Sequence, residues 1–272
     1  MKAIIVAGGH GSRLYPMTQF THKTLLPLCG RPIIDYVIST IRHAGIEDIT
    51  IIGNKFIDKI KDHVGSDVNY VLEVEPKGVA PALQLAREGN EGCPLLIWFS
   101  DNITNIDLST DVERFTEGAI LLTREVDNPS DFGIAIFEDG KIVDVVEKPE
   151  APEGNLAIGG IYIFDERFWH RLDSVQDSSS FSISEVTRQY LVEGSARIIS
   201  VGEETWIDCG TPSSLQRAAE MVEEGIFKIR EVQQRESESL APVLLEELSS
   251  IALVMPMICL FTILQEELSC QM

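Results

Sequence analysis

Residues 1–16 read MKAIIVAGGHGSRLYP, and this stretch is the strongest indication of the fold: a short apolar run followed by a glycine-rich loop. A single lysine precedes five apolar residues, a run too short for the apolar region of a secretory signal peptide and typical of a buried strand. The glycines that follow would end the strand and let backbone N–H groups approach a phosphate chain closely. Arg13 would add a cation that can bind a phosphate with two hydrogen bonds.

Strand-like and helix-like segments alternate over the first 125 residues. The β-rich runs lie at residues 3–6, 49–52, 70–74, 95–99 and 119–122. Between the first two runs, a helical spacing of apolar residues ends at Gly45 and is made by Ile33, Ile34, Val37, Ile38 and Ile41. The alternation predicts an α/β fold: a mostly parallel, doubly wound (Rossmann-like) mixed sheet with helices on both faces. Ligands of such sheets bind beyond the carboxyl ends of the strands, so we expect a site in the loops after Val6 and Phe99.

The pattern changes after Gly133. Residues 134–137 and 142–146 flank Asp139-Gly140 and predict an inserted antiparallel hairpin. A strand is expected at 158–164, a helix at about 182–193, a strand end and turn at 206–210, and a last helix from Thr211-Pro212 to about 224. We therefore assign residues 1–225 to one domain.

Residues 226–272 have a different composition. Residues 236–272 contain six Glu and no Lys or Arg, and residues 251–264 are apolar apart from Thr262. As a helix this apolar stretch would span roughly 21 Å, short of the roughly 30 Å core of a bilayer, and Pro256 interrupts it. We expect an acidic and apolar helical tail that packs on the body or on another subunit of a homo-oligomer, with a membrane anchor as the alternative.

Charge and cysteine content exclude several classes of function. A formal charge of −21 over 272 residues argues against a nucleic acid partner, which needs an excess of Lys and Arg. The five cysteines include no CxxC pair, so a disulfide framework is not expected and the pattern suits the cytoplasm. The five histidines are scattered along the chain, so a zinc site has little support.

The loop after the first strand differs from two common nucleotide-binding motifs. In residues 8–14, GGHGSRL, the third glycine of a dinucleotide fingerprint is absent, which argues against a dehydrogenase. No GKS or GKT follows, so the loop is not a Walker A motif either. Taken alone, the loop has a glycine-rich turn that carries a surface arginine as its alternative.

Longer motifs narrow this choice. Residues 8–16, GGHGSRLYP, followed by KTLLP at 23–27, resemble the signature of the sugar nucleotidyltransferase family, most closely its short-form glucose-1-phosphate thymidylyltransferases. Further family motifs recur in the same order, at Ser100-Asp101-Asn102, Phe132-Gly133, Glu147-Lys148-Pro149, Gly159-Gly160-Ile161-Tyr162 and Trp206-Ile207-Asp208-Cys209-Gly210. The resemblance extends from Met1 to about Gly225. It implies transfer of a nucleotidyl group from a nucleoside triphosphate to a sugar 1-phosphate, with release of pyrophosphate.

Asp101 and Asp208 are the candidate metal ligands. In-line attack at a phosphorus atom depends on positioning and on neutralisation of charge. Mg²⁺ takes oxygen ligands and usually keeps several waters, so two carboxylates and phosphate oxygens suffice. Without the resemblance, Asp101 could be a helix cap and Asp208 a turn residue.

The resemblance also implies the remaining roles. Arg13 would hold the triphosphate, Lys23 the α-phosphate and Lys148 the sugar phosphate, so the catalytic set is Arg13, Lys23, Asp101 and Asp208. Glu147 would accept hydrogen bonds from sugar hydroxyls. The substrate-binding set is Gly8, Gly9, Gly11, Ser12, Glu75, Gly78, Phe132, Gly133, Glu147, Lys148, Ile158 and Gly160. The alternative for Glu147-Lys148 is an exposed charged pair, and Cys209 is expected to be a small buried residue and not a nucleophile.

Several positions depart from the thymidylyltransferase pattern. Glu75 stands where that group carries a glutamine that contacts the base, in a loop shortened by about two residues; Pro81 replaces a second glutamine, and Phe132 a tyrosine. The base and sugar therefore stay open: we expect dTTP and glucose 1-phosphate, then UTP, then GTP. A non-catalytic sensor or scaffold domain is the rival. It is disfavoured because the candidate charged residues are all present.

Overall fold

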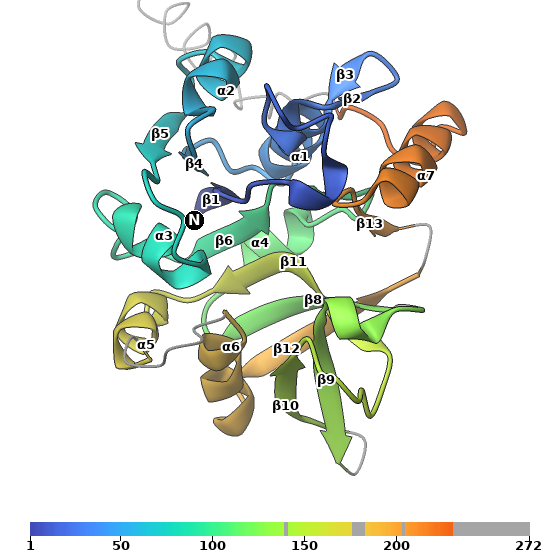
Figure 1. Cartoon of the computed structure of the whole chain (residues 1–272). Coiled ribbons are helices and arrows are strands. Elements are labelled where there is room, and N and C mark those ends of the chain that lie inside the picture. Colours follow the sequence, from blue (N-terminus) through green and yellow to red (C-terminus); the bar gives the residue numbers. More distant parts are fainter. Residues whose placement is uncertain (139–140, 176–182, 203–204, 231–272) are drawn as a thin grey trace, which may run out of the picture. The chain divides into compact units, whose positions relative to one another are not determined.

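The computed structural model describes residues 1–138, 141–175, 183–202 and 205–230. They belong to the first of two units, Met1–Val232 (Figure 1). The predicted turn at Asp139-Gly140 and all but the first residues of the predicted tail 226–272 lie outside the described residues. In the described part of the chain, no helix is both long and apolar enough to cross a membrane.

The first half of the sheet is parallel. The strand β1 (Lys2–Ala7) lies between β4 (Ile49–Gly53) and β6 (Leu95–Phe99), and β5 (Asn69–Leu72) pairs with the outer side of β4. The sequence predicted β6 with the observed bounds, but β5 ends two residues before the predicted Val74. Residue 73 is consequently the first residue beyond the carboxyl end of β5.

The second half is mixed. The long strand β11 (Leu156–Phe164) runs antiparallel to β6 and to β8 (Ala119–Glu125). The hairpin β9 (Gly133–Glu138) and β10 (Lys141–Glu147) joins the start of β11, while β12 (Ala196–Val201) runs parallel to β8. The sequence predicted a mostly parallel, mixed sheet, and the structure confirms it: residues 119–122 lie in β8, which runs in the same direction as β6 without pairing with it. β11 intervenes between β6 and β8 and reverses the direction of pairing.

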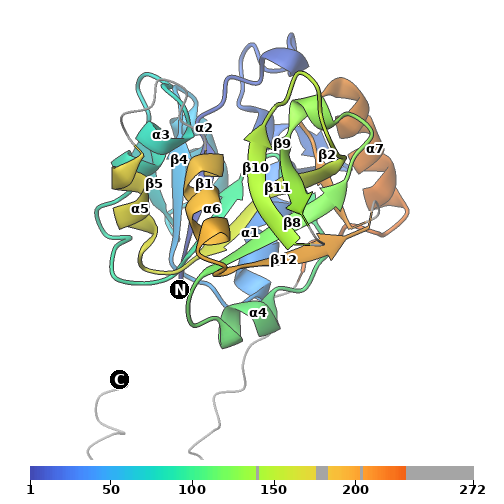
Figure 2. The ribbon, with the colours of Figure 1, turned by 90° about the horizontal axis from the view of Figure 1, so that it is seen from below.

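Helices cover both faces of the sheet, as predicted. Side chains of β1 alternate between two apolar cores, with Ala3 and Ile5 in one and Ile4 in the other. The first core includes residues of α1 (Ile33–His43), α2 (Ile57–Val64), α4 (Ser109–Arg114) and α7 (Pro212–Glu223). The second includes residues of α3 (Val79–Leu85), α5 (Phe168–Ser174) and α6 (Ile183–Val192) (Figures 1 and 2).

Two short ladders and three single turns lie outside the main sheet. The ladder of β7 (Asn102–Thr104) and β13 (Trp206–Asp208) is antiparallel and places Asp208 opposite Asn102. The other ladder joins β2 (Pro27–Leu28) to β3 (Arg31–Pro32). The turns are η1 (Ser12–Leu14), η2 (Lys23–Leu25) and η3 (Pro129–Asp131). A capping box at Thr211 and Ser214 starts α7 directly after β13, where the sequence predicted a helix.

Candidate active site

A cavity of about 260 Å³ opens at the carboxyl ends of β1 and β6. Its wall includes most of the predicted site residues: Gly9, Arg13, Lys23, Asp101, Phe132, Gly133, Glu147, Lys148, Ile158, Gly160 and Asp208. The predicted residues Gly8, Gly11, Ser12, Glu75 and Gly78 are not part of this wall. A larger cavity of about 780 Å³, near the start of β8, contains none of the predicted residues.

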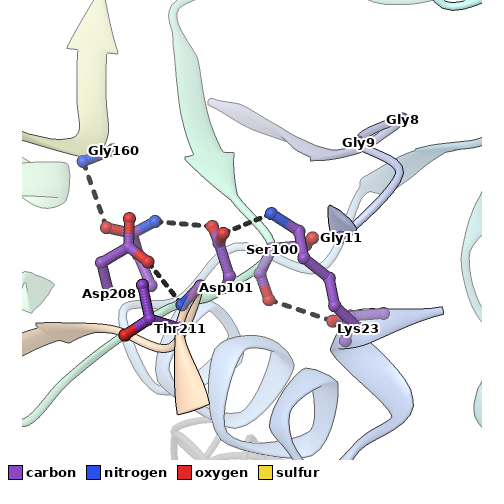
Figure 3. Close-up of polar contacts among 12 residues, drawn as sticks. Gly8, Gly9, Gly11, Lys23, Ser100, Asp101, Gly160, Asp208 and Thr211 are labelled. Atoms are coloured by element: carbon purple, nitrogen blue, oxygen red, sulfur yellow. Dashed lines mark hydrogen bonds and ion pairs between the residues drawn. The ribbon is translucent and has the colours of Figure 1, made fainter. Parts of the chain in front are cut away.

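Lys23 and Asp101 form a buried ion pair at the centre of the cavity (Figure 3). Burial opposes charge on both groups, but the pairing outweighs it. The pKa of Asp101 is therefore lowered and that of Lys23 raised from their ordinary values. The side-chain amide of Asn102 donates a second hydrogen bond, 2.9 Å long, to the Asp101 carboxylate. Both charges are present at neutral pH and fixed in direction.

Asp208 lies next to this pair and has no cation bonded to it in the described part of the chain. The antiparallel ladder brings it there: the N–H of Cys209 donates to the carbonyl of Asp101 at 2.7 Å. Burial, and then the charge of Asp101, raise the pKa of Asp208 to about 6. The N–H of Gly210 donates to the Asp208 carboxylate at 2.6 Å. The site therefore holds a buried carboxylate, Asp101, and a half-buried one, Asp208, with the Lys23 ammonium bonded to the first.

The guanidinium of Arg13 reaches the same place from the glycine-rich loop. A Cβ atom added to Gly210 would lie 2.7 Å from an Arg13 Nη2 and 2.6 Å from an Asp208 Oδ1. The chain needs glycine at this position because backbone, carboxylate and guanidinium converge there. Within the described ranges, the side chains of Arg13 and Lys148 make no hydrogen bond or ion pair. Both cations are thus available to a ligand.

The opposite wall comes from the hairpin and β11. Glu147, the last residue of β10, accepts a hydrogen bond of 2.8 Å from the hydroxyl of Ser184 in α6. Lys148 has a φ of 44°, in the left-handed region that non-glycine residues rarely occupy, and its N–H donates to the carbonyl of Phe132 at 2.9 Å. At Gly160, a Cβ atom would lie 2.8 Å from the Cβ of Phe99, so a side chain would displace neighbouring atoms.

Asn102 and Trp206 belong to two of the sequence motifs described above, but neither was predicted to have a role in the site. The side-chain oxygen of Asn102 accepts hydrogen bonds from the Trp206 indole at 2.8 Å and from the Gly160 N–H at 3.4 Å. Its amide nitrogen binds Asp101. Asn102 thus joins β7, β11 and β13 around one carboxylate. Because it is only 2% exposed, a charged or flexible substitute would not fit. Nothing in the local pattern distinguishes it from a turn residue.

The structure places Glu75 outside the wall of the cavity, so its contact with the base stays a prediction. The Glu75 side chain is 76% exposed and pairs with Lys77 at 3.3 Å. Glu73 is 3% exposed instead, and a Cβ atom on Gly8 would lie 1.9 Å from its Oε2. Burial raises the pKa of Glu73, and the N–H of Lys77 donates to its carboxylate. The predicted strand, residues 70–74, included Glu73. The observed strand β5 ends at Leu72, which makes Glu73 the first residue past the strand end.

Cys209 is fully buried, and burial raises its pKa well above the ordinary value. It is therefore a poor nucleophile at neutral pH, in agreement with the sequence expectation. Among the described residues, no three His, Cys, Asp or Glu side chains are grouped to hold a metal ion. The Asp101 and Asp208 carboxylates fit an ion that takes few protein ligands and completes its shell with water and phosphate oxygens.

Comparison with known proteins agrees with this geometry. The family model described as "Nucleotidyl transferase" matches residues 2–225. The glucose-1-phosphate thymidylyltransferase of Xanthomonas campestris pv. campestris (strain B100) is 34% identical over 237 residues, covering 82% of this chain and 80% of that protein. The enzyme of the same name from Neisseria meningitidis serogroup A is 34% identical over 240 residues, covering 82% and 83%.

Solved structures of proteins with related names also superpose on this chain. A Bacillus anthracis protein assigned to glucose-1-phosphate thymidylyltransferase superposes with a TM-score of 0.76 at 33% identity, over 81% of this chain and 94% of that one. Two structures of UDP-glucose pyrophosphorylase, at 22% identity, share the fold with TM-scores of 0.69 and 0.70. The family model covers more than half of the chain, and relatives above 30% identity match most of its length. The chain therefore belongs to the nucleotidyl transferase family.

Proposed function

We propose that the protein transfers a nucleotidyl group from a nucleoside triphosphate to a sugar 1-phosphate and releases pyrophosphate. The observation that carries this proposal is the convergence of two carboxylates, Asp101 and Asp208, with Lys23, Arg13 and Lys148 on one cavity. Such a set of cations and carboxylates suits a reaction in which two anionic substrates meet.

In the proposed reaction, an oxygen of the sugar phosphate attacks the α-phosphorus of the triphosphate. A new P–O bond forms on one side of the phosphorus while the bond to the β-phosphate oxygen breaks on the other, and pyrophosphate leaves with that electron pair. No protein base is needed because the attacking oxygen is already anionic. Lys23 neutralises the α-phosphate, Arg13 the departing pyrophosphate, and Lys148 the incoming sugar phosphate.

The donor set suits Mg²⁺ held by Asp101 and Asp208. When bound there, the ion would supply positive charge to phosphate oxygens. Its presence would also relieve the repulsion between the two carboxylates, which contributes to the raised pKa of Asp208.

For the substrates we propose dTTP and glucose 1-phosphate, because the relatives above 30% identity carry names for that activity. UTP ranks second because it differs from dTTP only by a methyl group and a sugar hydroxyl. GTP ranks third. The sugar ring is expected against Gly133 and Gly160, with Glu147 accepting hydrogen bonds from its hydroxyls.

The test is pyrophosphate release from purified protein supplied with Mg²⁺, each of the four triphosphates at equal concentration, and a panel of sugar 1-phosphates. We expect turnover with dTTP and glucose 1-phosphate, and its loss with chelator. Tight binding of both substrates without pyrophosphate release would refute the enzyme assignment in favour of a sensor or scaffold domain.

A further inference from the structure

The glycine-rich loop has an uneven pattern of hydrogen bonds. The carbonyl oxygens of Gly8, Gly9 and Gly11 all accept hydrogen bonds from side chains. Among the described residues, by contrast, the backbone N–H groups of residues 8–11 donate to no protein atom. A peptide whose carbonyls are bonded on one side presents its N–H groups on the other, and successive free N–H groups form an anion-binding concavity.

Three buried side chains produce this arrangement. The Asn54 amide donates to the Gly8 carbonyl at 3.2 Å and to the Gly9 carbonyl at 3.1 Å. His22 Nε2 lies 3.1 Å from the Gly9 carbonyl, and the Thr18 hydroxyl donates to the Gly11 carbonyl at 2.8 Å. None of the three is more than 7% exposed. Their hydrogen bonds are therefore shielded from competing water.

The orientation of Asn54 is itself fixed. Its side-chain oxygen accepts a hydrogen bond from the Phe56 N–H at 3.0 Å, which leaves the amide nitrogen facing the loop. Asn54 directly follows β4, so the neighbouring strand holds the loop in place. Similarly, His22 Nδ1 accepts from the Thr24 N–H at 3.2 Å, and the Thr24 hydroxyl donates to the Ser100 carbonyl at 3.0 Å. The loop is thus connected to both strands that flank β1.

We propose that Asn54, assisted by His22 and Thr18, is a positioning residue for the triphosphate and the pyrophosphate. It holds the loop carbonyls away from the ligand and so directs the loop N–H groups toward the phosphate oxygens. Without it, the carbonyl dipoles can rotate toward the same oxygens and repel them. This inference rests on the proposed function. It adds to that function a residue that does not touch the reacting atoms.

Asn54→Leu removes the donor and keeps a side chain that branches at Cγ, and Asn54→Asp keeps the shape but places an acceptor against two carbonyls. The matched control is Asn90→Leu. Asn90 is 3% exposed and its amide also donates to a carbonyl, that of Ala86 at 2.8 Å, and to the Thr50 hydroxyl at 3.2 Å. Asn90 does not line the cavity described above.

The experiment measures binding of inorganic pyrophosphate with Mg²⁺ by calorimetry, together with the KM values for triphosphate and sugar 1-phosphate. We expect both Asn54 variants to weaken pyrophosphate binding and raise the triphosphate KM by about tenfold, with the sugar phosphate KM unchanged. Asn90→Leu should lower the Tm and leave both KM values unchanged. Unchanged pyrophosphate binding in both Asn54 variants, or an equal loss in Asn90→Leu, would overturn the inference. Pyrophosphate binding that depends on Asn54 in a protein without turnover would refute the proposed function alone.

Discussion

The two walls of the cavity differ in how their charged groups are balanced. On the wall built by β1, β4 and β6, Asp101 is paired with Lys23, and the loop carbonyls are bonded to buried side chains. On the wall built by β10, β11 and β13, and within the described ranges, the Asp208 carboxylate accepts only the Gly210 N–H, and the Lys148 side chain has no partner. We call these the paired wall and the open wall.

The difference between the two walls shows which protein charges remain to be compensated by a bound ion or substrate. Within the paired wall, the charges of Lys23 and Asp101 already compensate one another, so this pair is in place before a ligand arrives. The open wall leaves the half-buried Asp208 carboxylate to be compensated by an ion, and the exposed Lys148 ammonium to be compensated by a phosphate. Substitutions in the paired wall should therefore affect stability and activity together. Those in the open wall should affect activity more than stability.

The largest expected effect tests this contrast directly. Asp101→Asn and Asp208→Asn should each reduce turnover by about a thousandfold or more, since each removes one of two proposed metal ligands. Their effects on the free energy of unfolding, measured with denaturant and without added metal, should have opposite signs. Asp101→Asn leaves the buried Lys23 without a counter-charge and should cost about 3 kcal/mol.

Asp208→Asn removes one of two neighbouring carboxylates and should raise the free energy of unfolding by about 1 kcal/mol at neutral pH. An Asp208→Asn variant with most of its activity would refute the metal assignment. Equal losses of stability in the two variants would remove the distinction between the walls.

The second prediction concerns His22, which has no counterpart in the open wall. Burial, and then the charge of Lys23, lower its pKa from 6.5 to about 4. Between these values the unfolded chain binds a proton that the folded chain does not. Stability contributed by neutral His22 is therefore complete above about pH 6.5 and falls by about 3 kcal/mol as the pH approaches 4.

His22→Asn should flatten this part of the dependence. The measurement is denaturant unfolding at a series of pH values, compared between the unmodified protein and the variant. Carboxylates contribute equally to both proteins, so the difference isolates His22. An identical pH dependence in the two proteins would show that His22 is not buried as a neutral ring.

Much of the paired wall was predictable from the sequence, because its parts follow one another along the chain. A short apolar run, a glycine-rich loop and an Asp after a second apolar run indicate a parallel sheet with its site at the carboxyl edge. The start of α7 was equally visible in Thr211-Pro212. In each case, the residues that determine the structure lie within a few positions of one another.

The elements and site residues that were not predicted depend on contacts between distant segments of the chain. β12 and β7 were not predicted: the three residues of β7 carry no period, and β12 owes its place to pairing with β8, which is more than 70 residues away. For the same reason, no role could be assigned from the sequence to Asn54, which bonds the Gly8 carbonyl 46 positions away, or to Asn102, which bonds the Gly160 N–H 58 positions away. Glu73 was not among the predicted site residues because the predicted strand extended to Val74, two residues beyond the end of β5.

The third prediction concerns Glu147 in the open wall. Glu147→Gln keeps the hydrogen bond from Ser184 but removes a charged acceptor for sugar hydroxyls. The KM for sugar 1-phosphate should rise by about thirtyfold, equivalent to about 2 kcal/mol, while the KM for triphosphate and the Tm stay unchanged. Ser184→Ala is the matched control and should give a smaller change in the same KM. A larger effect on the triphosphate KM would assign Glu147 to the other substrate.

The smallest expected effect concerns the base, for which we expect Glu73 to supply the contact that the sequence suggested for Glu75. The Glu73 carboxylate is buried beside Gly8, and within the described ranges no Lys or Arg is paired with it. We expect the base beside it, because it is the buried acceptor that adjoins the phosphate loop at the carboxyl edge of the sheet.

Thymine presents one N–H between two carbonyl oxygens, so an ionised carboxylate can accept from the N–H but repels the adjacent oxygens. Guanine presents two adjacent N–H donors, which a carboxylate matches better. An amide offers both an acceptor and a donor, so Glu73→Gln should increase the ratio of kcat/KM for dTTP over GTP by about tenfold, or about 1.4 kcal/mol. Glu75→Gln, on an exposed side chain, is the control and should leave the ratio unchanged. A ratio that responds to Glu75 and not to Glu73 would restore the sequence-based assignment, and a ratio that responds to neither would place the base against the backbone near Gly78.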